Sequence, residues 1–92
     1  MANNLFISYD LMTPGQGYDK VVERIKSLGS WAKVHYSLWY VSSSSSAKDA
    51  CAHVWSVMDA NDKLIVIDAK NNSAAWQNLD TEVAKYIRDT WT

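Results

Sequence analysis

The residue best suited to chemistry is an aspartate near the end of a short apolar run. Asp10 belongs to Leu5–Leu11, whose β-branched and aromatic content predicts a strand. A carboxylate at the end of a strand can hold Mg²⁺ through one or two protein oxygens, while water and phosphate fill the other positions. Asp10 can instead accept hydrogen bonds from the Thr13-Pro14-Gly15 loop, as aspartates do in turns. Both interpretations stay open, and a metal site would need a phosphate or the Asp10 of a second copy.

Further candidates for binding come from Tyr9 and from a second apolar segment. Tyr9 precedes Asp10 on the same predicted strand. Asp68 lies at the end of a later predicted strand, where its side chain either joins Asp10 at one rim of the sheet or simply lies in water. An imidazole has an unperturbed pKa of about 6.5, which would suit a proton shuttle at His35, although a hydrogen-bonded interface histidine is the simpler interpretation. The indole rings could stack nucleobases, but core or interface packing explains them as well; these are Trp31, Trp39 and Trp76.

Composition limits the class of protein. The 92 residues fit one domain, 48% of them are hydrophobic, and five Trp and five Tyr accompany a single Phe. A net charge of −1 does not favour strong non-specific binding to DNA by a monomer. Cys51 is the only cysteine, which excludes an internal disulfide, and two histidines with one cysteine give no zinc-site spacing. The first residues lack the pattern of a signal peptide, so we expect a soluble, cytoplasmic protein without a membrane segment.

The periodicity of apolar residues predicts the elements that position these side chains. After the first strand, helical spacing covers Asp19–Leu28, with Asp19 as N-cap and Gly29 as a left-handed C-terminal cap. The next aromatic and β-branched segment, Ala32–Ser42, is long enough to bend near Ser37 into two strands.

The second half of the chain continues with a helix, a strand and an appendage. Ser46 and Asp49 resemble a capping box at the start of a helix over Ala47–Ala60, whose apolar positions are Cys51, Val54, Trp55 and Met58. Lys63–Ala69 reads as a strand buried on both faces. Residues 71–92 form an appendage with a turn, a short edge strand over Ala74–Leu79, and a helix capped by Asp80. We expect Val83, Ile87 and Trp91 to line one face of that last helix, which we expect to cross to a partner subunit.

This order predicts an α+β domain of the ferredoxin-like βαββαβ type, with a core over residues 5–69 and both helices on one face of an antiparallel sheet. The other sheet face also carries apolar side chains, which favours homodimerisation through it. We expect the dimer face to consist of Phe6, Ser8, Asp10, Ser37 and Trp39.

At the level of short motifs, the chain resembles the CRISPR-associated Cas-two family and its short SinR-like relatives. The segment FISYDL resembles the opening strand of the family, VHYSLW resembles its signature strand, and KLIVIDA stands at the last core strand. The resemblance covers about Leu5–Ala69. Asp10 matches the aspartate of the first strand and Ser37 the signature serine, whereas Trp39 stands in place of a Phe and His35 in place of a Gln.

The resemblance implies ferredoxin-like homodimers. In some members the facing aspartates of the first strand bind a divalent ion and cleave nucleic acid, which implies Asp10 as the metal-binding and catalytic residue, with Mg²⁺ as cofactor. Other members form a non-catalytic bridge in spacer-integration complexes, and the segment Asn71–Thr92 departs from that pattern.

Two functional interpretations follow. The first is a homodimeric nucleic-acid-associated protein, a Mg²⁺-dependent phosphodiesterase centred on Asp10. The second is a non-catalytic dimeric module, such as a regulator or an inhibitor from a mobile element, that binds a partner protein or a nucleotide ligand.

Overall fold

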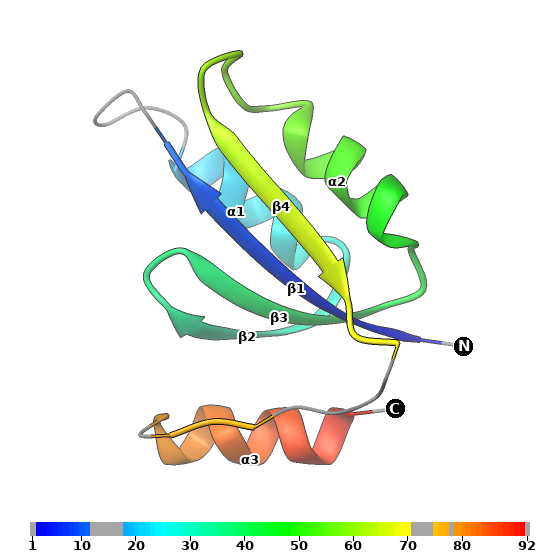
Figure 1. Ribbon diagram of the computed structural model, residues 1–92, viewed down its shortest axis with the longest axis vertical. Coiled ribbons are helices and arrows are strands. Elements are labelled where there is room, and N and C mark those ends of the chain that lie inside the picture. Colours follow the sequence, from blue (N-terminus) through cyan, green and yellow to red (C-terminus); the bar gives the residue numbers. More distant parts are fainter. Residues whose placement is uncertain (1, 12–17, 71–74, 78, 92) are drawn as a thin grey trace.

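The computed structural model describes residues 2–11, 18–70, 75–77 and 79–91. These residues form an α+β structure with one four-stranded antiparallel sheet and three helices (Figure 1). In chain order the elements are β1 (Asn3–Asp10), α1 (Tyr18–Lys26), β2 (Gly29–His35), β3 (Leu38–Ser43), α2 (Ala47–Trp55), β4 (Lys63–Asp68) and α3 (Thr81–Thr90).

The strands lie in the order β2-β3-β1-β4, so β1 is central and β2 and β4 form the edges. The predicted bend near Ser37 is confirmed, because Tyr36 and Ser37 form the turn between β2 and β3. A hydrogen bond of 3.2 Å from the Tyr9 amide to the Ser37 carbonyl ties this turn to the end of β1.

One face of the sheet is covered by α1 and α2, as the sequence predicted. The core on this side contains Leu5, Ile7 and Tyr9 of β1, Trp39 and Val41 of β3, Val21 and Ile25 of α1, and Ala50 and Val54 of α2. Apolar residues at helical spacing give each helix one stripe to bury against these strands. The Ser46 cap of α2 is confirmed, since its hydroxyl accepts a hydrogen bond of 3.1 Å from the Asp49 amide.

The opposite face is partly covered by α3 of the same chain, which Figure 1 shows below the β2–β3 hairpin. The predicted apolar face of this helix is confirmed. Val83 and Ile87 of α3, together with Trp91 directly after it, pack with Phe6, Ala32, Val34 and Tyr40. Asp80 caps the helix by accepting a hydrogen bond of 2.9 Å from the Glu82 amide. Here α3 packs on the sheet of its own chain, and the expected crossing to a partner subunit stays a prediction.

Several local expectations were wrong. Gly29 does not adopt a left-handed cap conformation but begins β2, and Asp19 lies within the first turn of α1 rather than before it. Trp55, one of the apolar positions of the helical pattern, is 39% exposed rather than buried with Val54. The predicted strand over residues 74–79 is absent from 75–77 and 79, and the rest of it lies outside the described residues.

The predicted double burial of β4 is not observed. Its residues alternate between exposed and half-buried, because only Leu64 and Val66 face the core beneath α2. Ile65 and Ile67 point to the other side of the sheet, where α3 does not reach, and are 55% and 51% exposed. The fold therefore leaves one part of its α3-side face uncovered, along β4 and the end of β1.

Candidate functional site

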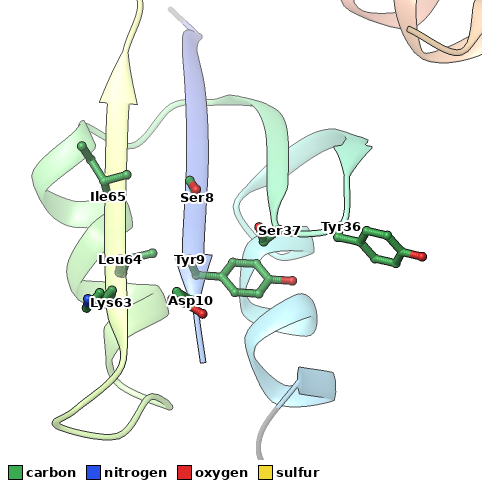
Figure 2. Close-up of a pocket in the computed structure, with 8 residues that line it drawn as sticks. All are labelled: Ser8, Tyr9, Asp10, Tyr36, Ser37, Lys63, Leu64 and Ile65. Atoms are coloured by element: carbon green, nitrogen blue, oxygen red, sulfur yellow. The ribbon is translucent and has the colours of Figure 1, made fainter. Parts of the chain in front are cut away.

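A hollow of about 480 Å³ lies where the C-terminal end of β1 meets the start of β4 and the turn between β2 and β3. Its lining residues are Ser8, Tyr9, Asp10, Tyr36, Ser37, Lys63, Leu64 and Ile65 (Figure 2). Three segments distant in sequence thus meet at one end of the sheet.

The register of β1 and β4 sets the chemistry of this hollow. Asp10 pairs with Lys63, and Ser8 pairs with Ile65, so these four side chains share the α3-side face. Asp10 and Lys63 are both exposed. Figure 2 shows the two side chains next to each other at the ends of their strands. The hollow therefore offers an accessible carboxylate, an accessible ammonium group and hydroxyl groups from Ser8 and Ser37.

The two tyrosines of the hollow differ in their exposure to solvent. Tyr9 is buried, and Figure 2 shows its ring directed from β1 toward the turn that carries Ser37. Tyr36 points away from the sheet and is 89% exposed. An aromatic ring in that position can contact a ligand without rearrangement of the core.

The structure brings together three of the five predicted site residues, namely Tyr9, Asp10 and Ser37. Trp39 does not belong to this site, because it pairs with Ile7 and lies 2% exposed in the core beneath α1 and α2. The expected dimer face of Phe6, Ser8, Asp10, Ser37 and Trp39 is therefore wrong in including Trp39. His35 is exposed at the end of β2 and is not among the lining residues.

The interpretation that Asp10 caps the loop of residues 13–15 lies outside the described residues. Asp68 does not reach the rim of Asp10, because it pairs with Leu5 at the opposite end of β1.

Sequence reasoning missed Lys63 and Tyr36 as site residues. An antiparallel pairing of the first strand with Lys63–Ala69 places the start of one against the end of the other, so Lys63 could have been assigned to Asp10. Tyr36 carries no such signal, because its exposure depends on the turn that the chain makes there.

Metal binding at this site would rest on Asp10. In the described part of the chain no group of three or more His, Cys, Asp or Glu side chains is placed to hold a metal ion. Mg²⁺ is commonly held by one or two carboxylates together with phosphate oxygens and water. The donor set therefore fits Mg²⁺ only if a second Asp10 or a phosphate contributes ligands.

A second hollow, of about 580 Å³, lies between α1 and α2 and is lined by Lys20, Glu23, Arg24, Ser27, His53 and Val57. The Ser27 hydroxyl donates to the Arg24 carbonyl at 2.7 Å and lies 2.8 Å from Nε2 of His53. The contact links the residue that follows α1 to His53 of α2.

None of the helices in the described ranges has the length and apolar character needed to cross a bilayer. Comparison of the chain with protein-family models, curated proteins and solved structures finds no match.

Proposed function

We propose that this chain is a homodimeric nucleic-acid-associated protein with a ferredoxin-like fold, and that the hollow at Asp10 is its site for a phosphate group. The strand order β2-β3-β1-β4 and the placement of α1 and α2 on one face support the fold assignment. The observation that supports the site is the convergence of Asp10, Lys63 and two serine hydroxyls on one open hollow.

The uncovered part of the α3-side face supports dimerisation. Ile65 and Ile67 are more than half exposed on β4, next to Ser8 and Asp10. Large aliphatic side chains grouped on an open sheet face favour contact with another protein surface. A two-fold axis that passes through this face beside Asp10 would bring the Asp10 carboxylates of two copies toward each other.

In this proposal each residue of the hollow has a defined task. The ammonium group of Lys63 and the hydroxyls of Ser8 and Ser37 bind the phosphate oxygens. The two Asp10 carboxylates would hold Mg²⁺, and the bound ion would supply Lewis-acid chemistry at the phosphate and lower the pKa of its bound water. Without a cation the two Asp10 carboxylates would repel each other, so cation binding would also favour the proposed dimer.

A second candidate function is a non-catalytic module that binds a nucleotide ligand or a partner protein. It is favoured by Lys63, which lies directly opposite Asp10 and offsets its charge. A neutral pair attracts a divalent cation less than an isolated carboxylate does. In that case the same hollow binds the phosphate through Lys63 without cleaving a bond.

A nuclease assay separates the two functions. Single- and double-stranded DNA and RNA are incubated with the wild type, Asp10→Asn and Asp68→Asn, in Mg²⁺ or Mn²⁺ and in EDTA. Asp68 is the matched control, since it ends β4 at the opposite end of the sheet. The phosphodiesterase proposal predicts metal-dependent cleavage that falls about 100-fold or more in Asp10→Asn only. Binding without cleavage by the wild type would instead support the non-catalytic module.

A further inference from the structure

Aromatic and cationic side chains alternate along the β2 edge of the sheet. We define the β2 strip as Lys26, Trp31, Lys33 and Tyr36. Nζ of Lys26 lies 4.4 Å from the centre of the Trp31 ring, and Nζ of Lys33 lies 5.9 Å from the centre of the Tyr36 ring. The buried ring of Trp39 on β3 lies beside both pairs. Its centre is 5.4 Å from that of Trp31 and 5.8 Å from Nζ of Lys33.

The outer side chains of the β2 strip are not explained by core packing. Trp31 is 39% exposed, and Tyr36 is almost fully exposed. Lys26 and Lys33 are exposed as well. Burial of an aromatic ring is strongly favourable, so two accessible rings held beside ammonium groups indicate a binding surface.

The charge of this edge differs from that of the whole chain. The net charge is −1, yet β2 contains Lys33 and no Asp or Glu. Lys26 adds a further positive charge from the end of α1. An anionic ligand is therefore attracted to the β2 edge in spite of the overall balance.

We infer that the β2 strip binds single-stranded nucleic acid. Ammonium groups pair with phosphates, and aromatic rings stack on bases whatever their identity, which is the combination that single strands require. In a duplex the bases are stacked on each other and offer no free faces to Trp31 or Tyr36. The β2 strip therefore selects single strands over duplexes and has little sequence preference.

The β2 strip also deepens the proposed function, on which this part of the inference rests. Tyr36 belongs both to the strip and to the hollow that contains Ser37 and Asp10. A strand that stacks on Tyr36 passes the turn between β2 and β3 and delivers its next phosphate to the hollow. Single-stranded nucleic acid is thus the substrate class that this geometry assigns to the site.

Fluorescence anisotropy in EDTA tests the β2 strip without metal-dependent cleavage. The probes are labelled oligo(dT) and oligo(U) of about 15 nucleotides, near the upper end of the site sizes of single-strand-binding OB folds, and a duplex of equal length. The variants are the double change Lys26→Gln with Lys33→Gln, and Tyr36→Ala. The matched controls are Lys85→Gln and Tyr86→Ala on α3, whose side chains are exposed on the other side of the sheet.

The wild type should bind both single strands more tightly than the duplex. Tyr36→Ala should weaken this binding roughly 5- to 150-fold, the loss expected for one stacked base. The double lysine variant should bind more weakly and lower the slope of log K against log salt by about 1.4, or 0.7 for each phosphate contact. Both controls should bind as the wild type does.

Two results would overturn the inference: equal affinity of the wild type for duplex and single strand, or unchanged single-strand affinity in both strip variants. Neither result depends on catalysis, because the affinities are measured in EDTA, where metal-dependent cleavage does not proceed. If the strip variants bind normally while Asp10→Asn loses cleavage, the β2 strip is wrong and the proposed function stands. If binding follows the strip but no condition yields cleavage, the phosphodiesterase is wrong and the strip stands.

Discussion

At the scale of single residues, Tyr40 is the central side chain of the core between the sheet and α3. It is fully buried, and its hydroxyl donates a hydrogen bond of 2.9 Å to Oδ1 of Asn4, which is buried too. Its ring stacks on Trp91 with centres 6.0 Å apart and contacts Phe6 at 5.5 Å. A buried polar tip with a partner is compatible with the core, whereas an unpaired one would cost free energy. Tyr40 thus joins β3 to both β1 and α3.

Burial raises the pKa of the Tyr40 hydroxyl above its ordinary value of 10.0, and the nearby hydroxyls of Ser42 and Thr90 only partly oppose this rise. A group whose pKa is raised on folding stabilises the fold below its unfolded pKa. That contribution is lost as the pH climbs through the higher folded value. The stability that Tyr40 contributes is therefore present at neutral pH and disappears above about pH 10.

We predict that Tyr40→Phe lowers the free energy of unfolding by about 1 kcal/mol at pH 7, because one buried hydrogen bond is removed. The difference between the two proteins should shrink above about pH 10, where only the wild type must ionise a buried hydroxyl. Urea unfolding of both proteins across this range measures the difference. A constant gap over the whole range would contradict the assigned role of the Tyr40 proton.

Residue-scale expectations from sequence could foresee which side chains lie together where this depends on position along a strand. Asp10, Tyr9 and Ser37 meet at one hollow because the end of β1 and the β2–β3 turn lie at the same end of the sheet. Trp39 was assigned to the wrong face. Its side depends on the register of β3 against β1, in which it pairs with Ile7, and a slip of one residue reverses the faces. Hydrophobic alternation alone does not set that register, because both faces carry apolar side chains.

At the scale of elements, the approach of β2 to β3 depends on Gly29. A Cβ atom at this position would overlap the backbone carbonyl oxygen of Ser42 and crowd Ser43, the residue with which Gly29 pairs. The requirement is for space rather than for a left-handed backbone. The sequence indicated a glycine at the end of a helix, which is common at caps, but could not show that a neighbouring strand lies against it.

We predict that Gly29→Ala destabilises the fold by about 1 to 3 kcal/mol, since the backbones of β2 and β3 must separate to admit a methyl group. Chemical denaturation measures this loss. Ser30→Ala is a suitable control, because Ser30 is exposed on the same strand. Equal destabilisation by the two changes would argue against the overlap with Ser42.

The helices and strands themselves were largely predictable, because each has a clear apolar period. The burial of β4 was not. A continuous apolar run is typical of a strand covered on both faces, but β4 is an edge strand and α3 packs over β2 and β3 instead. Which strands the last helix covers depends on the path of the chain after Asp68, and local periodicity carries no information about that path.

At the scale of the whole molecule, the large apolar side chains of the two sheet faces differ in whether a helix covers them. Trp39 lies within the core formed with α1 and α2, whereas Ile65 and Ile67 lie on the uncovered part of the α3-side face. The proposed dimer forms through this uncovered part, which also contains Asp10. Its assembly therefore depends on β4 rather than on the aromatic strand that the sequence indicated.

We predict that the wild type is a dimer at micromolar concentration and that Ile65→Asp is a folded monomer. A charge at position 65 meets water in the monomer but lies without a partner inside the proposed interface. Trp39→Asp should unfold the chain instead, because it buries a charge in the core. Lys85→Asp on α3 should leave the dimer intact, since its pairing with Asp89 is exposed and contributes at most about 1 kcal/mol.

Light scattering gives the mass of each protein, and circular dichroism shows whether it is folded. A monomeric wild type would remove the facing pair of Asp10 carboxylates, and with it the support for a shared metal ion, while single-strand binding by the β2 strip would be unaffected.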